Sequence, residues 1–164
     1  MDFNAIRLLV LDVDGVLTDG GVTLSGADEP STRTFHVQDG CAIKLWGERG
    51  GRAAIISGRS SEAVRRRAAE LGIEWVRQGV SDKIAAYEEL LAFAHVDDSA
   101  VAYVGDDLPD LPPMQRCAFP VAVDNAVPQV KRAAAYVTRR KGGSGCVAEI
   151  VEFLLQKQKR WTVA

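Results

Sequence analysis

The sequence predicts an α/β fold in which helices cover both faces of one parallel β-sheet. Short apolar segments of strand length alternate with segments of about 10–15 residues whose apolar positions recur at helical spacing, the pattern of βαβ units. No linker, internal repeat or low-complexity tract interrupts this alternation, and 164 residues fit one domain. We therefore expect residues 1–164 to form a single domain with a three-layer, Rossmann-like arrangement.

The first half of the chain is expected to supply three strands of the sheet, a β-hairpin and two helices. The apolar run at 6–11 is typical of a buried strand. Two β-prone segments, 22–24 and 32–37, flank the turn-forming stretch SGADEP and predict the hairpin. After Asp39, the apolar residues of CAIKLWGER recur at helical spacing, which predicts a helix that a pair of glycines ends. The other expected elements here are a strand at 53–56, a helix at 60–71 that Gly72 ends, and a strand at 73–76.

The second half of the chain continues the same alternation. Ser81 is expected to cap a helix that reaches about Ala94. A final helix at 145–158 has apolar residues three and four positions apart, which predicts one buried face. The expected strands of this half lie at 100–104, 121–123 and 136–138.

Composition and charge exclude several classes of protein. Hydrophobic residues make up 47% and charged residues 26%, which is typical of a globular protein. The net charge of −2 argues against a nucleic-acid partner, since phosphate binding needs a basic face. No apolar stretch approaches the roughly 20 residues that span a bilayer, and the first residues do not resemble a signal peptide. Three widely spaced cysteines predict neither disulfides nor a zinc site, so we expect a cytoplasmic protein without a membrane partner.

Polar and acidic residues follow three of the predicted strands at the point where each strand ends. They are Asp12 and Asp14 after the first strand, Ser57, Gly58 and Arg59 after the second, and Asp106, Asp107 and Asp110 after AVAYV. Each could be an ordinary turn or capping residue. Because ligands bind beyond the carboxyl ends of strands in open α/β sheets, their shared position predicts a functional site.

The residue types at this edge favour phosphoryl chemistry. Clustered carboxylates repel one another unless a cation neutralises them, and oxygen ligands suit Mg²⁺. A carboxylate can also attack phosphorus and form an aspartyl-phosphate. The hydroxyl of Ser57 and the ammonium group of Lys83 could hold the phosphoryl oxygens as charge shifts.

The same residues resemble the four motifs of the haloacid dehalogenase superfamily, in the right order. LLVLDVDGVLTDG resembles the first motif and IISG the second, while Lys83 takes the place of the third and VGDDLPD resembles the fourth. This resemblance implies that Asp12 is the nucleophile and Asp14 the general acid and base. It also implies Mg²⁺ held by the Asp12 carboxylate, the Asp14 main-chain carbonyl and Asp106. Ser57 and Lys83 would bind the phosphoryl group, with Asp107 and Asp110 in support.

The spacing of the motifs resembles the superfamily class that has no cap domain. The first two motifs lie 45 positions apart and the next two 26 positions apart, which leaves room for secondary-structure elements but not for a separate domain. Over nearly the whole chain, the segments F-H-V-x-DG, SGR, QG-x-SDK and YVTRRKGGSG resemble 3-deoxy-D-manno-octulosonate 8-phosphate phosphatases.

This closer resemblance implies a substrate, an assembly and further site residues. The substrate would be a small phosphorylated sugar acid, hydrolysed on the route to lipopolysaccharide. The assembly would be a homotetramer with a barrel built from the hairpins, and the Gly-rich segment near the C-terminus would reach toward a neighbouring active site. The implied substrate-binding residues are Asp39, Gly40, Gly58, Arg59, Arg67 and Lys83.

Three positions depart from the pattern of that family and leave alternatives open. Gln38 and Ala148 stand where the family often has arginine, and Cys41 with Ala42 replaces Tyr-Gly. A phosphatase for a nine-carbon keto sugar acid 9-phosphate is the nearest alternative. A non-catalytic, phosphatase-like regulatory module is another. A signalling receiver domain fits less well, because its phospho-acceptor would follow the third strand rather than the first.

Overall fold

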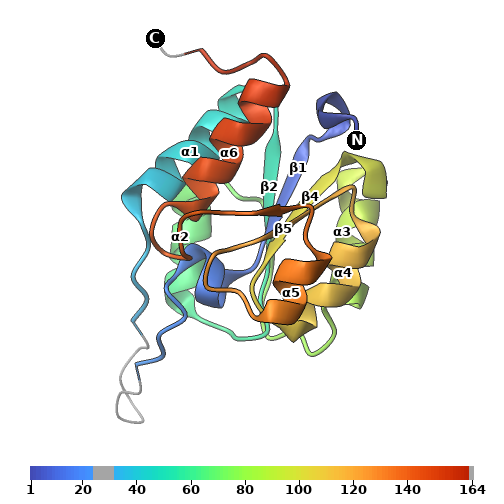
Figure 1. The fold of residues 1–164 in the computed structure, drawn as a ribbon. Coiled ribbons are helices and arrows are strands. Elements are labelled where there is room, and N and C mark those ends of the chain that lie inside the picture. The colour runs from blue at the N-terminus through green and yellow to red at the C-terminus, as the bar shows by residue number, and fades with distance from the viewer. Residues whose placement is uncertain (24–31, 163–164) are drawn as a thin grey trace.

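The computed structural model describes residues 1–23 and 32–162, whose strands all join one parallel sheet. The strand order is β3-β2-β1-β4-β5-β6, so the chain moves outward from β1 in one direction and then in the other (Figure 1). The strands are β1 (Leu8–Leu11), β2 (Arg52–Ile56), β3 (Trp75–Arg77), β4 (Val101–Gly105), β5 (Phe119–Ala122) and β6 (Tyr136–Val137). The predicted parallel α/β sheet is confirmed.

Helices cover both faces of this sheet, which makes three layers. The first group is α1 (Val37–Glu48), α2 (Glu62–Leu71) and α6 (Cys146–Lys157), and the second group, on the other face, is α3 (Lys83–Ala94), α4 (Leu111–Arg116) and α5 (Pro128–Ala133) (Figure 1). Right-handed crossovers between parallel strands place α1 and α2 on one face and α3, α4 and α5 on the other, while α6, which follows the last strand, packs against α1. Among the described residues, no helix combines the length and apolar character that crossing a membrane requires.

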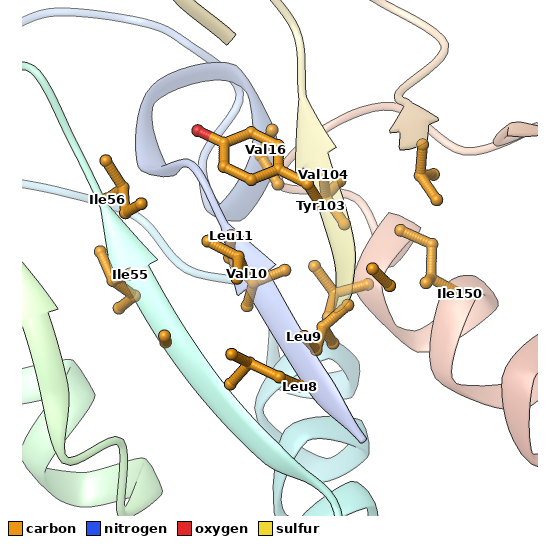
Figure 2. Packing of buried hydrophobic residues seen from close by; sticks show 14 of the residues in the cluster. Leu8, Leu9, Val10, Leu11, Val16, Ile55, Ile56, Tyr103, Val104 and Ile150 are labelled. Carbon is orange, nitrogen blue, oxygen red and sulfur yellow. The ribbon is translucent and has the colours of Figure 1, made fainter. Parts of the chain in front are cut away.

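The core is centred on β1, whose four residues are all buried. Figure 2 shows these side chains between those of β2 and β4, with Ile150 of α6 packed nearby. A strand buried on both faces needs a continuous apolar run, which explains LLVL. The register pairs Leu11 with Ile55 and with Val104, so the three strands end together and the residues after them meet at one edge.

Several predicted boundaries were wrong. Helix α1 begins at Val37 rather than Cys41, so Asp39 lies inside its first turn. The cap of α3 is Asp82, whose carboxylate accepts a hydrogen bond from the Ile84 backbone N–H at 3.0 Å, and not Ser81. The short helices α4 and α5 were not predicted, because each contains proline in its first turn and resembles a turn.

The predicted hairpin falls largely on residues 24–31, which lie outside the described part of the chain. Its described portions, 22–23 and 32–36, form no strand, and Val37 belongs to α1. The hairpin therefore stays a prediction.

Candidate active site

The carboxyl ends of β1, β2 and β4 bring the predicted residues to one edge of the sheet. Asp12 follows β1, Ser57 follows β2 and Asp106 follows β4. In the strand order, β2 lies on one side of β1 and β4 lies on the other side, so the order of the strands reverses at β1. Such a reversal leaves a crevice beyond the strand ends, which is where ligands bind in this class of sheet.

Lys83 lies between two buried carboxylates at this edge. Its Nζ is 2.8 Å from Asp12 Oδ1 and 2.8 Å from Asp110 Oδ1. Lys83 is 7% exposed, Asp12 6% and Asp110 0%. Burial by itself would lower the pKa of Lys83, but the two carboxylates outweigh it and raise that pKa. The ammonium group therefore stays charged beside Asp12.

The buried Asp110 carboxylate accepts hydrogen bonds from several groups of the site. Its Oδ1 also accepts a hydrogen bond from the Tyr103 hydroxyl at 2.9 Å, and its Oδ2 accepts from the backbone N–H groups of Asp106 and Asp107 at 3.1 and 3.2 Å. Four donors thus occupy this one carboxylate. Tyr103 was not among the residues singled out from the sequence, because its contact with Asp110 depends on the turn after β4.

The acidic cluster fits a divalent cation. Carboxylate oxygens of Asp12, Asp106 and Asp110 lie within 4.8 Å of one another. Because four donors already occupy Asp110, the two groups that would bind a cation are Asp12 and Asp106. The Oδ1 of Asp106 is buried and accepts no hydrogen bond from the described residues. Gly15, at φ +91°, leaves room for this carboxylate, since a Cβ there would overlap it. A buried carboxylate oxygen without a partner, beside a second carboxylate, favours a hard cation such as Mg²⁺.

The same crowding raises the pKa values of two carboxyl groups. Burial, followed by repulsion from Asp110, raises the pKa of Asp12 to about 6, although Lys83 opposes the shift. Burial and the charges of Asp12 and Asp110 raise the pKa of Asp106 to about 8. The protein without metal therefore binds protons near neutral pH that a cation must displace.

A pH-dependent effect of Mg²⁺ on stability follows. Because both pKa values lie above those of the unfolded chain, the stability from these groups is present at acidic pH and is lost as pH rises through about 6 and then about 8. We expect the melting temperature of the metal-free protein to fall between pH 6 and 8.5, and the increase caused by Mg²⁺ to grow over the same range. Apparent Mg²⁺ affinity should rise by up to about tenfold per pH unit while one proton is displaced.

Thermal melts with EDTA or Mg²⁺ at several pH values measure this effect, and Asp106→Asn is the matched variant. It removes the group with the higher pKa, so the pH dependence above pH 7 should flatten. An increase in melting temperature with Mg²⁺ that is the same at pH 6 and pH 8.5 would contradict the prediction.

Asp14 lies in the turn after Asp12 and faces two arginines. Its Oδ2 is 3.8 Å from Arg59 Nε, and its Oδ1 is 3.1 Å from Arg33 Nε. Arg59 was expected near the substrate and is about half exposed. Arg33 was not singled out from the sequence, since nothing in the segment STRTF indicates a contact with the loop after β1.

Ser57 and Gly58 lie where the sequence placed them, directly after β2. Ser57 is 2% exposed, and its Oγ accepts a hydrogen bond from the Arg59 backbone N–H at 3.3 Å. A Cβ at Gly58 would make only an ordinary contact with the Val80 carbonyl.

Asp39, Gly40 and Arg67 form a separate cluster between α1, α2 and α6. The Asp39 carboxylate accepts hydrogen bonds from the backbone N–H groups of Gly145 at 3.2 Å and Ala148 at 2.9 Å, so it caps α6. Burial raises the pKa of this carboxyl. The Arg67 guanidinium packs against Gly40 and pairs with Glu70 at 2.9 Å. The structure thus gives the Asp39 carboxylate a role in holding α6, and its predicted contact with the substrate stays a prediction.

The Gly-rich segment contacts the loop after β1 of its own chain. Asn125 links the two, since its Nδ2 donates to the Gly15 carbonyl at 2.9 Å and its Oδ1 accepts from the Gly142 N–H at 2.6 Å. The Gly143 N–H donates to the Val16 carbonyl at 2.9 Å. The predicted reach of this segment toward a neighbouring subunit stays a prediction. Asn125 had no sequence signal, because its partners lie far away along the chain.

The three departures from the family pattern lie together, away from the acidic cluster. Gln38, Cys41 and Ala148 line a cavity of about 330 Å³ between α1 and α6. Gln38 Oε1 accepts a hydrogen bond from Arg140 at 3.0 Å in the same place. None of the residues that line this cavity belongs to the acidic cluster.

Comparison with known proteins agrees with this fold and shows the family. The family described as haloacid dehalogenase-like hydrolases matches residues 73–150 of the chain. The chain is 43% identical to 3-deoxy-D-manno-octulosonate 8-phosphate phosphatase of Yersinia pestis over 155 residues, which cover 94% of this chain and 82% of that protein. Identity to the Escherichia coli K12 enzyme of the same name is 43% over 153 residues, 93% of this chain and 81% of the relative.

Solved structures give the same result. The crystal structure of the Yersinia pestis phosphatase has a TM-score of 0.93 and 42% identity, over 96% of this chain and 85% of that one. The phosphatase of Moraxella catarrhalis, solved with a magnesium ion, a phosphate ion and KDO, has a TM-score of 0.92 and 39% identity. The match covers 96% of this chain and 90% of that one. The chain belongs to the family of 3-deoxy-D-manno-octulosonate 8-phosphate phosphatases.

Proposed function

We propose that the protein hydrolyses 3-deoxy-D-manno-octulosonate 8-phosphate to the free sugar acid and phosphate, in the synthesis of lipopolysaccharide precursors. The observation that carries the proposal is the contact of Lys83 with Asp12 inside the acidic cluster of a chain of this family. A buried carboxylate with a permanent cation beside it is an activated nucleophile rather than a surface charge.

In the first step, Asp12 attacks the phosphorus atom. A bond forms between its carboxylate oxygen and phosphorus, the bond from phosphorus to the sugar oxygen breaks, and Asp14 gives its proton to that departing oxygen. Lys83 and the Ser57 hydroxyl hold the phosphoryl oxygens as negative charge shifts among them. The products of this step are the free sugar acid and an aspartyl-phosphate on Asp12.

In the second step, Asp14 acts as a base. It takes a proton from water, the water oxygen bonds to phosphorus, and the bond to Asp12 breaks to release phosphate. Asp12, the Asp14 carbonyl and Asp106 would hold Mg²⁺, which when bound neutralises charge on the phosphoryl oxygens. Asp110 and Asp107 support the site: Asp110 holds Lys83 and the backbone of Asp106, and Asp107 caps the turn that follows.

The substrate carries a carboxylate as well as a phosphate, and Arg59 would bind one of these two anionic groups. Its guanidinium lies beside Asp14 and is about half exposed, so it can swing toward a bound ligand. Arg67 pairs with Glu70 within the cluster of Asp39 and Gly40, so contact with the substrate would require that ion pair to open.

Phosphate release from a panel of esters tests the proposal. The panel contains the octulosonate 8-phosphate, nine-carbon keto acid 9-phosphates, hexose phosphates and p-nitrophenyl phosphate, each with Mg²⁺ and again with EDTA. We expect the octulosonate ester to have the highest kcat/KM and EDTA to abolish its turnover. A preference for a nine-carbon acid would overturn the substrate but keep the chemistry. An inert protein would favour the regulatory module.

A further prediction concerns the Gly-rich segment. A Cβ on Gly142 would overlap the Gly15 carbonyl, so Gly142→Ala must displace the loop that carries Asp14. Since small misplacement of reacting groups is costly, we expect kcat/KM to fall by about 10- to 100-fold. Gly47→Ala is the control, because no atom of the described residues lies within 4 Å of a Cβ placed there, and alanine favours the helix. Equal activities of the two variants would contradict the prediction.

We also propose that the protein is a homotetramer. Val22 and Val37, at the two ends of the segment predicted to form the hairpin, are 45% and 74% exposed, which suits an apolar contact between subunits. Light scattering at several protein concentrations tests this, and a monomer at all of them would contradict it.

We place the protein in the cytoplasm. Cys41, Cys117 and Cys146 are all free thiols, as expected in a reducing compartment.

A further inference from the structure

Arg33 is a buried cation beside the active site. It belongs to the coil at 32–36 that precedes α1, yet its side chain is only 3% exposed. Its Nε lies 3.1 Å from Asp14 Oδ1, and its Nη1 donates to the carbonyl of its own neighbour Thr32 at 3.1 Å. A guanidinium is rarely buried without a paired charge, and Asp14 supplies that charge.

The contact holds Asp14 by charge rather than by a hydrogen bond. Both Arg33 Nε and Asp14 Oδ1 are buried, and neither has a hydrogen-bond partner among the described residues. The Oδ1 atom of Asp14 therefore keeps its lone pairs, while attraction to Arg33 limits where the carboxylate can point. Arg59 reaches the other oxygen from 3.8 Å but is about half exposed, so it constrains Asp14 less.

Proton transfer to a departing oxygen depends on where the acid points. Asp14 sits in the turn after Asp12, where its backbone leaves helical geometry at ψ 114°. With 20% of its side chain exposed, Asp14 has room to turn toward solvent unless something holds it. The acid must lie within hydrogen-bond reach of the leaving oxygen, so a fixed orientation raises the rate.

We propose that Arg33 is a positioning residue that orients Asp14 for proton transfer to the leaving group. This inference rests on the proposed phosphatase function and deepens it. Arg33 acts through Asp14, since Lys83 already supplies the cation beside the nucleophile. The segment before α1 thereby contributes to catalysis from outside the four sequence motifs.

The dependence of rate on the leaving group tests the proposal. Phenyl phosphate releases a phenoxide far more basic than p-nitrophenoxide, so its cleavage needs the acid more. Neither ester carries a carboxylate, so lost contact with a sugar acid cannot produce the difference. We expect Arg33→Gln to lower kcat/KM for phenyl phosphate by about 10- to 100-fold, part of the usual contribution of a general acid. The loss for p-nitrophenyl phosphate should be several times smaller.

Matched variants separate positioning from general damage. Asp14→Asn should change the ratio of the two kcat/KM values in the same direction, and adding Arg33→Gln to it should cause no further change in that ratio. Arg33→Lys keeps the charge, so its ratio of kcat/KM values should lie between those of Arg33→Gln and the wild type. Arg66→Gln makes the same change at an exposed position on α2 and should leave both rates unaltered.

The outcomes distinguish the inference from the proposed function. If Arg33→Gln lowers kcat/KM equally for both esters, the positioning role is wrong. It is also wrong if adding Arg33→Gln to Asp14→Asn changes the ratio of the two kcat/KM values further. Either result would leave the phosphatase function intact. If the wild-type protein releases no phosphate from any ester, the phosphatase function is wrong and the role of Arg33 falls with it.

Discussion

Asp12→Asn is expected to abolish phosphate release while the fold stays intact. The amide has the shape of the carboxylate but cannot attack phosphorus, so kcat should fall by about 10⁴-fold or more, the order of loss when a covalent nucleophile is removed. Lys83 keeps Asp110 as its partner at 2.8 Å, so the buried ammonium is not left unpaired. The variant also loses a carboxyl group whose burial and neighbours raise its pKa to about 6. Its free energy of unfolding should be unchanged or higher.

Steady-state kinetics and thermal melts without metal measure both parts of this result. Asp97→Asn is the control, since it makes the same chemical change at an exposed carboxylate before β4, at the opposite edge of the sheet. It should leave kcat unaltered. Activity of Asp12→Asn within a factor of ten of the wild type would mean that another residue is the nucleophile.

Lys83→Met should cost both activity and stability. Methionine retains the length of the side chain but removes the cation that lies 2.8 Å from both Asp12 and Asp110. Loss of one charged donor to the phosphoryl group is expected to lower kcat by about 10²- to 10³-fold. Leaving two buried carboxylates without their cation should destabilise the fold by about 3 kcal/mol near neutral pH.

The pH dependence identifies the cause of that destabilisation. Without Lys83, the pKa of Asp12 should rise further, because burial and Asp110 already raise it and Lys83 is what opposes them. Protonation then relieves the repulsion at acidic pH, so the stability difference from the wild type should shrink from pH 8 toward pH 5. Denaturant unfolding at both pH values measures it. Lys44→Met, at an exposed position on α1, is the control. A difference that is the same at both pH values would point to lost packing instead.

The acidic edge of the sheet was predictable because its causes are local. Each buried strand is a continuous apolar run, and Asp12, Ser57 and Asp106 come directly after such runs. Parallel strands end at the same edge, so the meeting of these residues follows from the order of elements. The roles assigned to them came from the resemblance to a known family, which the comparisons bear out at the level of the family.

The start of α1 was predicted wrongly because a distant segment supplies the hydrogen-bond partners of Asp39. Asp39 and Gly40 resemble the end of a loop, so α1 was predicted to start after them. In the structure, the Asp39 carboxylate binds the first backbone N–H groups of α6, more than a hundred residues later. The gain from capping that helix outweighs the weak helical preference of aspartate and glycine.

The sequence by itself determined the parallel sheet, the strand ends and the carboxylates that lie there, because periodicity and spacing are properties of neighbouring residues. Only the tertiary structure decided that Tyr103 fixes Asp110, that Asn125 joins the Gly-rich segment to Gly15, and that Arg33 faces Asp14. Each of these contacts depends on how folded turns are placed relative to one another. Coulomb attraction and hydrogen bonding act over a few ångströms in space, so separation along the chain carries no record of them.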